Sequence, residues 1–285
     1  MKSRNNMLMV LLSLFLIQID GFRNGKWSDA TEPEQEDRRF IIHGHETEPL
    51  SYPSIVRLVR DNLDSIHCGG VLITDLWVLT AAHCRARYAV FAQHSLREGT
   101  QYTQGRFIIK TIRHSQYNKG RPFANDIALL KVVSPVKLSR AVVPVTILDP
   151  QTRIDENATC FIVGWGSTMG TGDASVLREA HVPIMTSQEC TDVWAKFHHP
   201  KNVTSDQICN DVRYNPSSAC AGDSGGPLYC QFGGRNYLAG LTSFGPKGCK
   251  RNETYPLPTV FTNVSAYLDW IVDIVKNDYH SGLRL

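Results

Sequence analysis

The sequence predicts an all-β fold of the sandwich or barrel type that ends in one α-helix. From residue 41 onward, short stretches rich in Val, Ile, Leu, Thr and aromatic residues alternate with Gly, Pro, Asn and Asp. The last periodic segment instead repeats apolar residues at helical spacing. A third observation is the presence of 8 cysteines among 285 residues, which indicates a disulfide-stabilised protein from an oxidising compartment.

Five stretches carry the strand signal most clearly, because each combines β-branched or aromatic residues with bounding turn residues. They are SIVRLV (54–59), GVLITDLWVLT (70–80), FIVGWG (161–166), YLAGLTSF (237–244) and TVFTNV (259–264). No repeat of about 20 to 50 residues is visible, which argues against a solenoid or propeller. The pattern alone leaves open whether the strands build one large domain or two small barrels.

The predicted helix is the one exception to the β pattern, and it comes last. Its apolar residues recur at i, i+3, i+4 and i+7, which places them on one helix face: Leu268, Ile271, Val272 and Val275. Ser265 precedes them and is expected to cap the helix, because a serine side chain can accept a bond from the first free N–H groups.

The first 40 residues are expected to be removed from the mature protein. Lys2 and Arg4 precede the apolar run MLMVLLSLFLI, which is typical of a secretory signal peptide, here residues 1–21. Because this run is shorter than the ~20 apolar residues of a membrane span, we expect no membrane anchor. Residues 22–40 are polar and lack cysteine, so we interpret them as an activation pro-segment or a disordered linker. Residues 41–285 then form the functional domain.

Charge and cysteine spacing exclude several classes of partner and site. The net charge of +3 is mild and scattered, which argues against a nucleic-acid partner. No C-x-x-C pair is present, which argues against a zinc ribbon or a redox centre. Four sequons predict N-glycosylation of a secreted chain, at Asn157, Asn202, Asn252 and Asn263.

Three motifs combine the residue types of a catalytic site: TAAHC (80–84), NDIALL (125–130) and CAGDSGGP (220–227). Each alone has a structural explanation, since His83 fits a core, Asp126 a turn cap and Ser224 a glycine-rich turn. Together they supply a serine nucleophile, a histidine base that activates it, and a carboxylate that orients the histidine.

The glycines around Ser224 allow a tight turn. The N–H groups of Gly222 and Ser224 can then converge on a developing oxyanion.

With these motifs in this order, the chain resembles the trypsin/chymotrypsin-type (family S1) serine proteases from Ile41 to about Lys276. The resemblance implies two six-stranded antiparallel β-barrels, the chymotrypsin-like fold, with the catalytic site at their junction and a C-terminal helix. It implies a general base at His83, an orienting acid at Asp126 and a nucleophile at Ser224, acting through an acyl-enzyme. It also implies four disulfides: Cys68–Cys84, Cys160–Cys230, Cys190–Cys209 and Cys220–Cys249.

Activation in this family frees an N-terminal ammonium group that pairs with the aspartate before the serine, which here implies Ile41 and Asp223. In DRRFIIHG (37–44) the dibasic pair ends at Arg39, yet the family-like terminus begins after Phe40. We therefore expect a cut after Phe40, made by the mature enzyme or by a protease of like specificity. The alternative is a cut after Arg39 and removal of Phe40 by an aminopeptidase.

Six residues form the substrate pocket by the same resemblance: Ser218, Ala219, Ser243, Phe244, Gly245 and Thr259. Trypsin-like members carry Asp where this chain has Ser218, and without that anion a Lys or Arg side chain would be buried unpaired. Thr259 is expected to make the pocket shallower, which predicts cleavage after Leu, Met, Phe or Tyr. Phe123 is expected to narrow the next subsite.

The sequence thus predicts a secreted, extracellular, monomeric serine endopeptidase that is made as a zymogen and acts on proteins or peptides. We expect no cofactor and no metal, because Gln93 stands at the position of the glutamate in the family's calcium loop. Protein protease inhibitors are the other expected partners. The alternative is a catalytically inactive, protease-like binding protein. Digestive and regulatory proteolysis both stay open.

Overall fold

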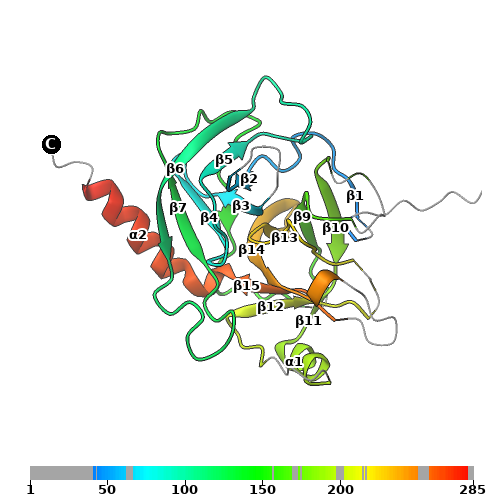
Figure 1. Cartoon of the computed structure of the whole chain (residues 1–285). Coiled ribbons are helices and arrows are strands. Elements are labelled where there is room, and N and C mark those ends of the chain that lie inside the picture. The colour runs from blue at the N-terminus through cyan, green and yellow to red at the C-terminus, as the bar shows by residue number, and fades with distance from the viewer. Residues whose placement is uncertain are drawn as a thin grey trace, which may run out of the picture. The chain divides into compact units, whose positions relative to one another are not determined.

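The structure is a computed structural model that describes residues 41–42, 44–61, 67–155, 157–168, 173, 175–196, 202–213, 215, 217–249 and 257–281. These residues belong to one compact unit, Arg38–Leu285 (Figure 1). The expected signal peptide and pro-segment, including Phe40, lie outside the described residues. Among the described residues, no helix combines the length and the apolar character that a membrane crossing requires.

Six antiparallel strands of the first half close into a barrel in the order β2-β3-β4-β7-β6-β5. They are β2 (Ile55–Val59), β3 (Cys68–Leu72), β4 (Trp77–Thr80), β5 (Tyr88–Phe91), β6 (Gln104–Arg113) and β7 (Ala128–Val132). Leu58, Val78 and Leu130 pack in its core with at most 1% exposure. Burial of each such side chain contributes roughly 1.5–3 kcal/mol.

The predicted stretch 70–80 is two strands rather than one. A turn separates β3 from β4, because the Thr74 hydroxyl accepts hydrogen bonds from the backbone N–H groups of Leu76 and Trp77, both at 3.2 Å. Side-chain bonds of this kind offer the backbone an alternative to the strand ladder.

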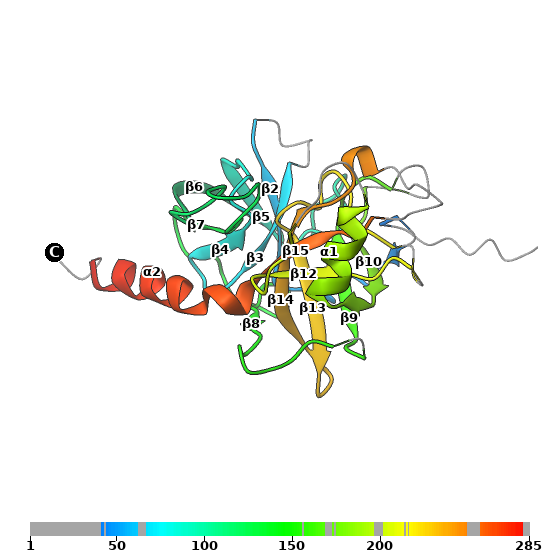
Figure 2. The ribbon, with the colours of Figure 1, turned by 90° about the horizontal axis from the view of Figure 1, so that it is seen from below.

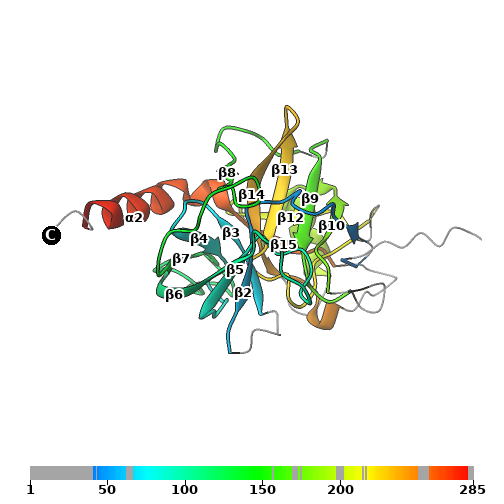
Figure 3. The same cartoon turned by 90° about the horizontal axis from the view of Figure 1, so that it is seen from above.

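The remaining strands form a nine-stranded sheet in the order β1-β10-β9-β13-β14-β15-β12-β11, with β8 paired in parallel to β14. The strands are β1 (His45–Glu46), β8 (Thr146–Ile147), β9 (Cys160–Gly164), β10 (Arg178–Val182), β11 (Ile184–Met185), β12 (Gln207–Asn210), β13 (Pro227–Phe232), β14 (Arg235–Phe244) and β15 (Val260–Asn263). Figures 2 and 3 show this sheet beside the first barrel.

The nine-stranded sheet is curled into a half-barrel. β10 pairs with β9, and β11 pairs with β12 at the other end of the sheet, while Pro183 alone separates β10 from β11. Proline has no N–H and interrupts the ladder, so the chain bends there and serves both neighbours. Of the two expected barrels, strand pairing among the described residues closes the first, and the second is this curled sheet. The predicted fold class is confirmed.

In the described part of the chain two α-helices pack on this framework, and one of them was predicted from the sequence. The predicted helix, α2 (Leu268–Ser281), follows the short 3-10 helix η2 (Val264–Tyr267). Ser265 is not its N-cap: it lies inside η2, and its hydroxyl donates to Asn263 Oδ1 at 2.8 Å.

The other α-helix, α1 (Ser187–Ala195), begins with a capping box in which Thr186 and Glu189 bond each other's backbone N–H. One further 3-10 helix, η1, spans Lys247–Cys249.

Four disulfides are present in the structure: Cys68–Cys84, Cys160–Cys230, Cys190–Cys209 and Cys220–Cys249. They are the pairs that the family resemblance implies. The first closes the loop that ends next to His83, and the last ties the segment before Ser224 to η1. Both disulfides therefore restrain segments that carry the candidate catalytic residues.

Candidate active site

His83 and Asp126 come from neighbouring strand ends of the first barrel and contact each other directly. His83 follows β4, Asp126 precedes β7, and β4 pairs with β7. His83 Nδ1 lies 2.7 Å from Asp126 Oδ2, and the backbone N–H of His83 donates to Oδ1 at 3.0 Å. The carboxylate therefore fixes both the ring and the backbone of the histidine, with Nδ1 as the protonated nitrogen.

Asp126 is fully buried and is stabilised by hydrogen bonds from the second half of the molecule. The Ser243 hydroxyl donates to Asp126 Oδ2 at 2.6 Å, and the Thr262 hydroxyl donates to the Asp126 backbone oxygen at 2.9 Å. A buried carboxylate needs such donors because its desolvation is costly. The contacts place this pair at the junction of the two barrels.

Ser224 lies in a loop that is held from both sides. The Ser224 carbonyl accepts from Gly69 N at 2.8 Å, and Gly225 N donates to the Thr242 carbonyl at 2.7 Å. Gly225 has a φ of 72°, and a Cβ there would lie 2.1 Å from Thr80 Oγ1, so this position requires glycine.

Two N–H groups of the Ser224 loop have no acceptor among the described residues. Within the described part of the chain, the structure gives the N–H groups of Gly222 and Ser224 no acceptor, whereas Asp223 N between them donates to the Cys220 carbonyl at 3.0 Å. Gly222 has a φ of 103°, a conformation that glycine adopts without strain. Both N–H groups are therefore available to an external anion.

Asp223 is buried behind this loop in a space bounded by two glycines. Its Oδ1 accepts from Gly166 N at 2.8 Å, and its Oδ2 accepts from Cys220 N at 2.9 Å. A Cβ on Gly164 or Gly166 would lie within 2.3 Å of a side-chain oxygen of Asp223. Burial raises the pKa of Asp223 to about 6, against the opposing effect of the two backbone donors.

Ile41 packs beneath the same segment. Its side chain is 1% exposed and lies in a core cluster with Ile162, Ala219 and Leu228, while Ile42 forms a backbone bridge to Ser218. Ile41 has a φ of 49°, which is unfavourable for a β-branched residue. The start of the domain is thus tied to the segment that leads to Ser224.

A pocket of about 220 Å³ opens beside Ser224. Five of the six predicted pocket residues line it: Ala219, Ser243, Phe244, Gly245 and Thr259. The sixth, Ser218, is not among the lining residues and is 4% exposed. Thr259 stands across the pocket, since its Oγ1 accepts from Ala219 N at 3.3 Å and lies 3.6 Å from the place of a Cβ on Gly245.

Comparisons with known proteins identify the family. The sequence profile of the family described as Trypsin matches residues 41–271. The chain belongs to the trypsin family.

Several relatives of this trypsin-family chain are similar over most of their length. Kallikrein-11 of Mus musculus is 35% identical, with 84% of this chain and 83% of the relative covered. Granzyme F of Mus musculus is 36% identical, with coverages of 81% and 89%. The solved structure of neuropsin, a serine protease expressed in the limbic system of mouse brain, matches with a TM-score of 0.68 and 30% identity, covering 81% of this chain and 98% of that one.

One residue that matters to the pocket of this trypsin-family chain was missed from the sequence. Asn210 is fully buried at the end of β12, and its amide bridges the segment before Ser218 and the segment before β15. Its Nδ2 donates to the Ser217 carbonyl at 2.8 Å, and its Oδ1 accepts from Thr259 N at 2.7 Å. Its signal in the sequence is weak, because an Asn after Cys209 gives no indication of a partner 49 residues away.

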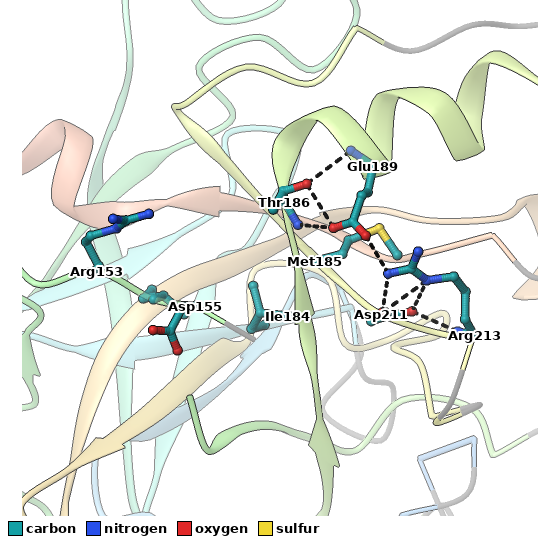
Figure 4. Close-up of a pocket in the computed structure, with 9 residues that line it drawn as sticks. Arg153, Asp155, Ile184, Met185, Thr186, Glu189, Asp211 and Arg213 are labelled. Atoms are coloured by element: carbon teal, nitrogen blue, oxygen red, sulfur yellow. Dashed lines mark hydrogen bonds and ion pairs between the residues drawn. The ribbon is translucent and has the colours of Figure 1, made fainter. Parts of the chain in front are cut away.

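A second pocket, of about 500 Å³, is not lined by His83, Asp126 or Ser224 and is shown in Figure 4. Arg213 lies between two acids there, 2.9 Å from Glu189 Oε1 and 2.6 Å from Asp211 Oδ2. Hydrogen bonds from the Thr186 backbone and Arg213 lower the pKa of Glu189 to about 2. Arg213 therefore pairs with both acids, and the cluster stabilises the start of α1.

The remaining predicted sites differ in how much of them is described. Asn157 and Asn202 are exposed, while Asn252 lies outside the described residues. Asn263 is half-buried, and its Nδ2 donates to the Ser205 carbonyl at 3.1 Å.

One histidine–cysteine group of the described chain has the compactness of a metal site, namely Cys68, His83 and Cys84. Its two cysteines form a disulfide and offer no thiolate, so the group does not fit a metal ion. Gln93, which stands at the position of the family's calcium-loop glutamate, accepts a hydrogen bond through its Oε1 from Arg57 Nη1 at 2.8 Å.

Proposed function

We propose that this trypsin-family chain is a secreted serine endopeptidase, made as a zymogen, that cleaves after apolar residues. The observation that carries the proposal is the His83–Asp126 contact of 2.7 Å at a carboxylate with no exposure. It lies next to the Ser224 loop, two of whose N–H groups have no acceptor among the described residues. This arrangement supports a His83/Asp126/Ser224 triad with an oxyanion hole formed by Gly222 and Ser224.

The chemistry follows from the position of each proton. Asp126 holds the Nδ1 proton of His83, so the other ring nitrogen is free to take the proton of the Ser224 hydroxyl as its oxygen attacks the substrate carbonyl. The carbonyl oxygen then becomes an oxyanion that accepts from the Gly222 and Ser224 N–H groups; loss of one such donor costs on the order of 3 kcal/mol. His83 returns its proton to the leaving amine, and water hydrolyses the acyl-enzyme by the reverse sequence.

The composition of the pocket supports specificity for apolar residues. Among the described lining residues there is no carboxylate that could pair with a Lys or Arg side chain. Thr259 is held by hydrogen bonds to Ala219 N and Asn210 Oδ1, and its side chain reduces the depth of the pocket. We expect Leu, Met, Phe and Tyr to fit, and Trp to be disfavoured.

Burial of Asp223 supports the zymogen form. With its carboxylate accepting only two backbone donors among the described residues, Asp223 in the uncut chain has no cation next to it. A cut after Phe40 would create an ammonium group on Ile41, whose side chain already packs under the same segment. Pairing of this ammonium with Asp223 would then hold the Ser224 loop in its active conformation.

The test combines self-activation with active-site labelling. Purified precursor is followed over time by N-terminal sequencing and intact mass, with Ser224→Ala as the control, and both are exposed to a fluorophosphonate probe. We expect an Ile41 terminus and labelling in the wild type only. A protein that stays unlabelled after it has been cut before Ile41 by another protease would instead be the inactive, protease-like binding protein.

A further inference from the structure

We propose that Arg121 is a specificity-determining residue, which holds Phe123 in place and thereby narrows the subsite next to the primary pocket. This inference rests on the proposed protease function. It assigns a positioning role to a residue that does not itself touch the substrate or the triad.

Phe123 stands between the candidate base and the wall of the primary pocket. Its ring meets His83 edge-on, with centroids 6.0 Å apart, and packs against Phe244 at 5.1 Å. Phe244 in turn meets Trp194 at 5.7 Å and lines the pocket beside Ser224. A substrate peptide that pairs in extended form with the backbone at the end of β14 would place the second residue before its cleaved bond against Phe123.

The backbone that presents Phe123 is strained. Phe123 itself has a φ of 59°, and its loop contains two further left-handed non-glycine residues, Asn118 at 57° and Asn125 at 51°. Asparagine tolerates this conformation, but a bulky aromatic residue does not favour it. Such a conformation persists only when the surroundings enforce it.

Local hydrogen bonds enforce part of the loop conformation. Asn118 Oδ1 accepts from Phe123 N at 3.1 Å, and Asn118 N donates to the Ala124 carbonyl at 2.8 Å. Tyr267 Oη donates to Asn125 Oδ1 at 3.1 Å, which ties the end of the loop to η2. These bonds close the loop on itself and fix its last residue, Asn125. They do not attach the part of the loop around Arg121 to the second sheet.

Arg121 anchors this part of the loop by crossing to the second sheet. Its Nη2 lies 2.7 and 2.8 Å from the two Asp206 oxygens and 2.5 Å from Thr204 Oγ1, and its Nη1 donates to Gln207 Oε1 at 2.7 Å. The two ionic side chains are 28% and 26% exposed, which limits competition from water. These acceptors engage both terminal nitrogens of the guanidinium group in charge-assisted hydrogen bonds.

Loss of the Arg121 anchor should therefore release Phe123. Arg121 precedes Phe123 by only two residues, so the restraint acts directly on the strained position. Without it the loop can relax to ordinary φ values, and the ring can leave its place against Phe244. The subsite would widen and accept larger side chains.

The experiment uses the mature enzyme and two peptide substrates. They differ only in the second residue before the cleaved bond, which is Ala in one and Phe in the other. Arg121→Met keeps the length of the side chain and removes its donors. We expect it to raise kcat/KM for the Phe peptide relative to the Ala peptide about tenfold, through KM, with kcat for the Ala peptide unchanged. Arg106→Met is the matched control, because Arg106 donates to carbonyl oxygens of the first barrel, and it should leave the ratio unchanged.

A double variant separates positioning from general support. In the Phe123→Ala background the peptide ratio should already be shifted, and Arg121→Met should add nothing to it. An equal loss of kcat/KM for both peptides would overturn the inference. A change in the peptide ratio caused by Arg121→Met that persists in the Phe123→Ala background would overturn it as well. A wild-type enzyme that cleaves neither peptide and resists the fluorophosphonate probe would overturn the proposed function instead.

Discussion

Ionised Asp223 should destabilise the uncut chain, and the size of this effect follows from its burial. The pKa of its carboxyl is raised from 3.8 to about 6 because it is removed from water. A shift of about two units corresponds to about 3 kcal/mol, at about 1.4 kcal/mol per unit. Well below pH 3.8 the group is protonated in both the folded and the unfolded chain, and the folded state bears no penalty.

The sign of the pH dependence is therefore fixed. As the pH rises from ~4 to ~6, the unfolded chain releases the Asp223 proton more readily, and the free energy of unfolding falls by about 3 kcal/mol from this group. Glu189 acts in another window: its lowered pKa of about 2 makes its contribution disappear only as the pH falls below ~4.5. The two groups can thus be told apart.

The assay is urea unfolding of the uncut precursor at several pH values between about 4 and 7, with disulfides intact and Ser224→Ala present to prevent self-cleavage. Asp223→Asn removes the titrating group. The difference in unfolding free energy between the two proteins should change by about 3 kcal/mol across this range, in favour of Asp223→Asn at the higher pH. A difference that does not vary with pH would refute the reasoning.

Three further predictions concern the surroundings of the site. Ser243→Ala removes the donor at 2.6 Å from Asp126 and should lower kcat about tenfold with little change in KM, as steady-state kinetics would measure; an unchanged kcat would contradict the role of this bond. Gly166→Ala would place a Cβ 2.2 Å from Asp223 Oδ2 and displace the carboxylate that should hold the Ser224 loop, so labelling of Ser224 by the probe after activation should fall at least about tenfold. Full labelling would show that the loop does not depend on the space around Asp223. Contrary to the expectation from its sequon, Asn263 should remain unmodified because its Nδ2 donates to the Ser205 carbonyl, and peptide mass spectrometry that finds a glycan there would disprove this.

The strands could be predicted where both the local pattern and burial agree. The stretch 54–59 corresponds to β2, because every residue of that strand is buried and its composition is β-branched and apolar. β6 was not predicted, since its solvent-facing positions carry Phe107 and Ile109 at 65% and 60% exposure and obscure the alternation. The missed helix α1 did have a signal, the Thr186–Glu189 capping box.

The candidate site was predictable to the extent that its chemistry lies in short motifs. His83, Asp126 and Ser224 each stand in a distinctive local sequence, and the family resemblance relates them to one another. By contrast, the contacts of Arg121 with Asp206 and of Asn210 with Thr259 join residues 85 and 49 positions apart. These residues have ordinary surroundings in sequence, so their roles follow only from the folded chain.

The most direct test of the central claim is a cleavage profile of the enzyme that begins at Ile41. A peptide library that varies only the residue at the cleaved bond would be compared between the wild type and Ser224→Ala, with kcat/KM determined for each member. We predict that Leu, Met, Phe and Tyr are preferred and that Ser224→Ala is inactive throughout. Preference for Arg or Lys, or equal cleavage by Ser224→Ala, would contradict the account.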